Sequence, residues 1–212
     1  MRRAWFLLLL VSGMHAELLD RVALYSGRQV ITELQLDEEI RVTAFLNREP
    51  VRENPETRRA AAHRLVDQML IEREMRLNRY PLPTDAEVEK YFQQVKGQFG
   101  SESSFERTLA AYRLSDAVLR AHLALQLTML RFIDFRFRPE VFVSNEEIEK
   151  FYEANLQNWL RQRSDAPPPS LSASREAIRD AMIQQRADEA LNAWLEQSRK
   201  QAKIVYLDRT LE

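Results

Sequence analysis

The chain contains no cysteine among its 212 residues. This absence excludes disulfide bonds, zinc sites built on thiolates, a cysteine nucleophile and a lipid-modified cysteine in one step. It does not indicate a compartment, because a chain without cysteine tolerates both oxidising and reducing surroundings.

Glycine is also scarce, with 4 residues, whereas average usage is roughly 7%. The scarcity argues against glycine-rich phosphate loops, β-propellers and turn-dense sandwiches, and it favours long helices. Neither sign of charge dominates: the 31 lysines and arginines balance 32 aspartates and glutamates, which gives no general electrostatic reason to bind nucleic acid. Hydrophobic residues make up 45% of the chain, too many for a disordered protein.

Two arginines near the N-terminus precede the apolar run Ala4–Val11. The run is far shorter than the roughly 20 residues that span a bilayer, and it suits the hydrophobic part of a secretory signal peptide, about 7–15 residues. We therefore predict a signal peptide over 1–16, export of the mature protein and no stable membrane insertion. Cleavage after Gly13 and cleavage after Ala16 both remain open, and the alternative is an apolar N-terminal helix of a cytosolic protein.

Apolar spacing and capping residues predict a mainly helical fold. Capping boxes, a Ser or Thr followed three residues later by Glu, indicate helix starts at Thr84, Ser103 and Ser144. The helix after Ser115 is expected to be the longest, and it is apolar nearly all round, so other helices enclose it or it offers surface to a partner. The predicted elements are a hairpin over 20–32, helices over 33–47, 55–77 and 116–137, helices from 84, 103 and 144, a last helix over 174–201 and a β-prone run over 203–208.

No catalytic or metal-binding pattern is visible. His63 and His122 are the only histidines beyond the predicted signal peptide, and the nearest carboxylate, Asp67, gives one histidine and one acid, too few for a metal site. Gly-x-Ser-x-Gly and Gly-x-Gly-x-x-Gly motifs are both absent. An arginine-rich helix carries interspersed acids, including Glu72 four residues before Arg76, which is typical of a solvated helix face rather than of a phosphate site. We expect no active site and no cofactor.

The segment 130–138 packs three phenylalanines and three arginines into nine positions. One interpretation is core packing at a helix end. The other is an adaptable apolar surface that holds unfolded polypeptide segments, with a methionine contributing plasticity and arginines pairing with client carboxylates. The candidate client-binding residues are Met129, Phe132, Phe135, Phe137 and Phe142.

Four segments in a fixed order carry a resemblance to a known family. They are V-A-L-Y-S-G-R-Q-V-I-T at 22–32, H-R-L-V-D-Q-M-L-I at 63–71, V-S-N-E-E-I-E-K-F-Y at 143–152, and the last helix with the run that follows it, 185–204. The first three are similar to the V-A-x-V-N-G-x-x-I-T, L-I-D-x-x-L-I and V-T-D-E-E-I-x-x-Y-Y patterns of the SurA-type periplasmic chaperones and related parvulin-associated foldases. The chain resembles this family over most of residues 20–207.

The resemblance implies a SurA- and trigger-factor-like helical chaperone core with a small β-sheet, in which the opening hairpin pairs with a closing strand at 204–207. The implied organisation is chaperone helices over 17–155, a proline-rich loop over 156–173, and a C-terminal helix and strand over 174–212 that complete the same domain. In the family a parvulin prolyl isomerase domain normally follows the segment matching 143–152. The loop here has 18 residues, whereas domains contain about 50–200, so we expect no isomerase domain and no enzyme activity.

The resemblance and the apolar segment together predict an ATP-independent periplasmic chaperone, a holdase that binds unfolded outer-membrane or secreted polypeptides weakly and at many sites. The expected partners are therefore unfolded polypeptides and not nucleic acid. A non-catalytic adaptor or dimerising module of the same fold is the alternative. A residual prolyl isomerase is a third hypothesis, which the missing domain disfavours, and the oligomeric state stays open.

Overall fold

The structure, a computed structural model, describes residues 20–161 and 169–211, so the predicted signal peptide over 1–16 lies outside the described residues. Within the described ranges, no helix combines the length and the apolar character that a membrane span requires. The elements are β1 Val22–Ser26, β2 Gln29–Thr32, α1 Glu33–Asn47, α2 Pro55–Leu77, α3 Asp85–Gly97, α4 Glu102–Ala111, α5 Asp116–Arg136, η1 Arg138–Glu140, α6 Asn145–Arg161, α7 Leu171–Gln201, β3 Val205–Tyr206 and η2 Arg209–Leu211.

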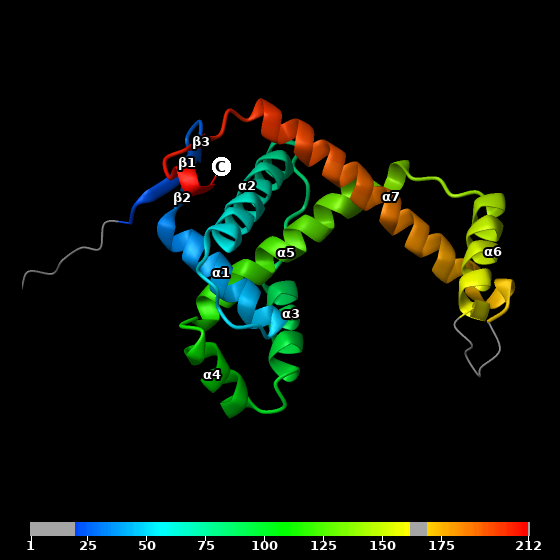
Figure 1. Cartoon of the computed structure of the whole chain (residues 1–212), viewed down its shortest axis with the longest axis horizontal. Coiled ribbons are helices and arrows are strands. Elements are labelled where there is room, and N and C mark those ends of the chain that lie inside the picture. The colour runs from blue at the N-terminus through cyan, green and yellow to red at the C-terminus, as the bar shows by residue number, and fades with distance from the viewer. Residues whose placement is uncertain (1–19, 162–168, 212) are drawn as a thin grey trace, which may run out of the picture.

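One three-stranded antiparallel sheet joins segments from opposite ends of the chain, in the order β2-β1-β3. Gly27, at a φ of 60°, forms the turn between β1 and β2. On the other side of β1, Tyr25 pairs with Val205 and Leu24 pairs with Tyr206. The prediction of a mainly α fold with a small sheet, built from an opening hairpin and a closing strand, is therefore confirmed (Figure 1).

Side-chain caps fix the starts of the helices. At the start of α3, the Thr84 hydroxyl accepts from the N–H of Glu87, whose carboxylate accepts from the N–H of Thr84. Ser144 and Glu147 form the same reciprocal pair at the start of α6. Two of the three predicted capping boxes are confirmed, and each satisfies N–H groups that have no partner inside the helix.

The predicted start of α4 at Ser103 is wrong. The helix begins earlier, at Glu102, because the hydroxyl of Ser101 accepts a hydrogen bond from the N–H of Ser104 and caps the first turn. Ser101 therefore takes the capping role that the sequence pattern assigned to its neighbour.

The longest of the described helices is α7, with 31 residues, and not α5, which has 21. α7 begins at Leu171, three residues before the predicted start at 174, where the Ser170 hydroxyl accepts from the N–H of Ala173 and caps the helix. Since α6 also continues to Arg161, both ends of the segment 156–173 are helical, and the connection between α6 and α7 is shorter than the predicted loop.

Three apolar clusters form the core, and α5 contributes to two of them. The first lies between the sheet, α1, α2 and the C-terminal tail, and the second lies where α3 and α4 cover the ends of α1 and α5. The third joins α2, α5 and α7. Figure 1 shows α7 running from the sheet past α2 and α5, with its N-terminal half and α6 projecting together as an arm.

Ion pairs attach α7 to both α2 and α6. Arg199 on α7 donates two hydrogen bonds to Asp67 on α2, with Nε–Oδ1 and Nη2–Oδ2 distances of 2.6 Å each. In the arm, the Arg186 guanidinium bonds the carboxylate of Glu147, and the N–H of Ser144 donates to the same group. These interactions, that with Arg186 first, lower the pKa of Glu147 to about 2.

Leu211 completes the first cluster from the C-terminal tail, and none of its surface is exposed. We expect Leu211→Ala to lower the free energy of unfolding by about 2–5 kcal/mol, because it removes buried methyl groups and leaves a cavity. Leu207→Ala is the matched control, since that side chain is 58% exposed, and its expected effect is within about 0.5 kcal/mol. Urea denaturation followed by circular dichroism measures both, and equal losses would contradict this packing.

Candidate functional site

A groove runs along one face of α5. Its first part, between α1, α2 and α5, has a volume of about 370 Å³. Its second part, between α2, α5 and the segment that follows α2, has a volume of about 480 Å³. Ala121 and Leu125 line both parts, so the two are continuous along the helix, and we call them together the α5 groove. The other walls include Glu38, Val42, Leu65, Gln68 and Val118 in the first part, and Glu72, Arg76, Leu82, Pro83, Ala124 and Thr128 in the second.

Small side chains on α5 leave room for this groove. Ala117, Ala121, Ala124 and Thr128 follow one another at intervals of three or four residues and therefore lie on one face of the helix. Other faces of α5 carry large side chains that are buried in the core clusters. The helix therefore packs against neighbouring elements on several faces, and the face that carries the small side chains remains open.

A chain of hydrogen-bonded polar side chains crosses the interior beside the groove. Its centre is the carboxylate of Glu39, which is 4% exposed and accepts from Arg64 Nε at 2.6 Å and from His122 Nδ1 at 3.2 Å. The other ring nitrogen of His122 lies 3.2 Å from the amide nitrogen of Gln126, and the Tyr91 hydroxyl donates to the Gln126 carbonyl at 3.1 Å. The chain ties α1, α2, α5 and α3 together.

The charge of Glu39 is stabilised by its partners. Burial alone raises the pKa of a carboxyl group, but the interactions with His122 and then with Arg64 outweigh this effect and hold the pKa of Glu39 below its usual 4.5. Both partners are bonded to this carboxylate.

Gln68, on α2, lines the groove, and its side-chain oxygen lacks a hydrogen-bond partner among the described residues. The residue is 8% exposed, and its Oε1 atom is buried without a hydrogen-bond partner among the described residues. A buried acceptor that loses its partner costs about 1–3 kcal/mol. The groove therefore contains a polar atom that its own protein does not satisfy.

The histidine and carboxylate considered from the sequence do not form a pair. Asp67 accepts two hydrogen bonds from Arg199, and His63 is exposed on the surface of α2. Across residues 20–161 and 169–211, no three side chains of the types that ligate metals cluster together. The predicted helix-surface pair is confirmed, with Arg76 Nη1 3.6 Å from Glu72 Oε2.

Two of the predicted client-binding residues, Phe132 and Phe137, lie in the third core cluster. Phe132 has no exposed surface and Phe137 is 6% exposed. The ring centroid of Phe132 lies 4.9 Å from that of Trp194 on α7 and 5.4 Å from that of Phe137. Their assignment as surface contacts is wrong, because α7 covers this side of α5, and core packing is the correct interpretation for both.

The other three candidates are accessible to different degrees. Met129 is half-buried against the third cluster. Phe135 is 48% exposed and its ring stacks on Tyr80, while Phe142, between η1 and α6, is 78% exposed. None of the three lines the α5 groove.

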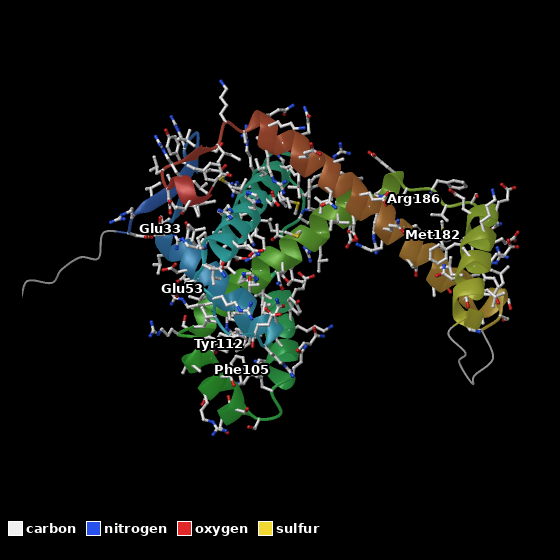
Figure 2. The ribbon with its side chains drawn as sticks, viewed as in Figure 1. Glu33, Glu53, Phe105, Tyr112, Met182 and Arg186 are labelled. Carbon is white, nitrogen blue, oxygen red and sulfur yellow. The ribbon has the colours of Figure 1, made fainter. Side chains whose placement is uncertain are left out.

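The sequence interpretation missed the groove because it looked for large apolar residues. The groove depends instead on alanines at helical spacing within a helix that is otherwise rich in leucine and phenylalanine. Small residues confined to one face of a long apolar helix are the signal that marks such a site. Figure 2 labels Phe105 and Tyr112, whose rings contact that of Phe45 on α1 edge to face.

Comparison with known proteins identifies no relative: no family model matches the chain, and no curated protein matches it either.

Substitutions of Phe132 and Phe135 test which side of α5 is buried by α7. We expect Phe132→Ala to lower the free energy of unfolding by about 3–5 kcal/mol, because it removes a fully buried ring. Phe135→Ala removes a half-exposed ring that stacks on one neighbour, and its expected cost is about 0.5–1.5 kcal/mol. Urea denaturation measures both, and a larger loss in Phe135→Ala would overturn the burial described above.

Glu39→Gln tests the buried polar chain. At neutral pH we expect a loss of about 1.5–3 kcal/mol, the range for hydrogen bonds to a charged group. The folded pKa of Glu39 lies below the unfolded value near 4.5, so its charge stabilises the fold above that pH, and this contribution is lost as the pH falls through the folded pKa.

The difference between wild type and Glu39→Gln must therefore shrink as the pH falls below 4.5. Urea denaturation across a pH series measures it, with the exposed Glu153→Gln on α6 as the control. A difference that stays constant with pH contradicts the stabilising role of the charge.

Proposed function

We propose that the protein is an ATP-independent chaperone, an exported holdase that binds unfolded polypeptide segments in the α5 groove. The observation that carries the proposal is the groove itself: a long, open and largely apolar surface that no described element of the chain covers. An apolar groove that is open to water offers contacts to the apolar side chains of a partner.

The lining of the groove favours a flexible chain over a compact ligand. A small-molecule site encloses most of its ligand and converges several polar groups on it. The α5 groove is open along its length, and its apolar walls, such as Leu65, Val118 and Leu125, suit side chains of many shapes. Weak binding to such a surface lets clients leave without nucleotide hydrolysis.

The arrangement of the chain ends also supports the proposal. The SurA-type resemblance implies an opening hairpin that pairs with a closing strand, and β1 pairs with both β2 and β3 in this way. The resemblance further implies the periplasmic location and outer-membrane or secreted clients. The departure from the family, an 18-residue interval where the isomerase domain normally lies, implies the absence of prolyl isomerase activity. All three remain parts of the proposal.

A second candidate, an adaptor or dimerising module, is favoured by apolar side chains outside the groove. Leu77 is 68% exposed at the end of α2, and Phe142 is 78% exposed at the base of the arm. Residues of this kind suit one folded partner or a second copy of the chain. Sedimentation of the purified protein, with Phe142→Ser as the comparison, tests this alternative.

The chaperone proposal is tested with a substitution that places a large side chain in the groove. Ala121 lines both parts of the groove and is exposed, so Ala121→Trp adds a ring there without disturbing the core. Light scattering follows the aggregation of an unfolded outer-membrane protein without nucleotide. We expect wild type to suppress aggregation near a one-to-one ratio, and we expect Ala121→Trp to bind roughly tenfold more weakly, equivalent to losing about 1.4 kcal/mol.

Ala193→Trp is the matched control, because Ala193 is exposed on α7 and lines neither part of the groove. It is expected to behave like wild type. Equal suppression by wild type and Ala121→Trp would exclude the groove as the binding site. No suppression by the wild type would refute the holdase and favour the adaptor.

A further inference from the structure

One end of the α5 groove carries an unbalanced negative charge. Of the ionisable residues that line the groove, Glu39 and His122 bond each other, and Glu72 pairs with Arg76 at the far end. Glu38 is the exception: no ion pair or hydrogen bond of its carboxylate occurs among the described residues. The end between α1 and α2 thus presents an anion without a cation.

The same end contains the unsatisfied acceptor of Gln68. Its buried Oε1 has no donor among the described residues, whereas the carbonyl of the nearby Gln35 already accepts from the N–H of Thr32 in the cap of α1. In the structure this atom is buried in the groove wall, so a client donor supplies the missing hydrogen bond only when the Gln68 side chain rotates to bring Oε1 into the groove. Two independent observations, a free anion and an unpaired acceptor, point to a ligand that donates.

We propose that this end of the α5 groove selects client segments in which a lysine or arginine lies next to apolar residues. The cation pairs with Glu38, a backbone or side-chain N–H of the client donates to Gln68, and the apolar side chains contact Leu65, Val118 and Leu125. An acidic residue at the same place meets a like charge without a compensating cation, which disfavours it. This selectivity rests on the proposed chaperone function and adds a client chemistry to it.

The experiment uses two labelled peptides that share one apolar sequence and differ only in a central lysine or glutamate. Fluorescence anisotropy with the full-length protein measures both affinities at low salt. We expect the lysine peptide to bind roughly fivefold more tightly, the scale of one half-exposed ion pair, and the preference to shrink as salt screens the charges.

Glu38→Lys is the decisive charge variant. It should reverse the preference between the two peptides, while Glu38→Gln should abolish it. Glu153→Lys makes the same change on an exposed part of α6 and should leave the preference as in wild type. An unchanged preference in Glu38→Lys would overturn the proposal.

Gln68→Met is the decisive acceptor variant, because methionine has a similar shape and no carbonyl. Removing an unsatisfied buried acceptor should raise the urea midpoint, and the loss of the hydrogen bond should weaken binding of both peptides several-fold. A raised midpoint with unchanged binding would show that Gln68 does not contact the client, and a lowered midpoint would show that its amide is satisfied in the fold.

These outcomes separate the selectivity from the chaperone function. If both peptides bind equally, and Ala121→Trp still removes the binding, then the groove binds clients without regard to charge and the selectivity fails alone. If neither peptide binds and wild type does not suppress aggregation, both proposals fail together.

Discussion

The buried carboxylate of Glu39 is the constraint on which the helical core depends. An ionised carboxylate in an apolar interior is strongly unfavourable unless other groups supply hydrogen bonds and charge. Here they come from two other helices, Arg64 from α2 and His122 from α5. Because each of the three helices contributes one member, none of them can move without leaving a polar group unpaired. The spacing between α1, α2 and α5 is therefore fixed.

That spacing explains why the groove stays open. Glu39 and His122 belong to its wall, so the contacts that satisfy the buried charge also fix the distance between α1 and α5. The alanines of α5 are too small to fill the space left between the helices, and collapse of α1 onto α5 would break the hydrogen bonds of Glu39. An apolar groove that faces water needs such a brace, because burial of its lining would otherwise favour closure.

The sequence predicted the local structure well, but it predicted few long-range contacts apart from the pairing of the opening hairpin with the closing strand, which the family resemblance implied. Caps such as Thr84 with Glu87, and the turn at Gly27, depend on neighbouring residues, so they are visible in the pattern. Phe132 and Phe135 have the same local chemistry, and only the position of α7, formed much later in the chain, buries one and exposes the other. The pairing of Glu39 with His122 likewise joins distant segments and leaves no periodic signal. Which residues of a largely apolar helix are exposed can therefore be assigned only once the tertiary arrangement of the helices is known.

The two ends of the groove differ in charge, so the groove has a direction, which bears on how it would hold an extended chain under the proposed function. One end carries the unpaired Glu38, and the other carries the mutually neutralised Glu72 and Arg76. Apolar contacts along the alanine face are non-directional, so they fix neither the orientation nor the register of a bound segment. A single charge at one end can fix both at a modest gain in affinity. The proposed holdase function requires that clients leave without an energy source, and this combination suits that requirement because it gives orientation while the binding stays weak.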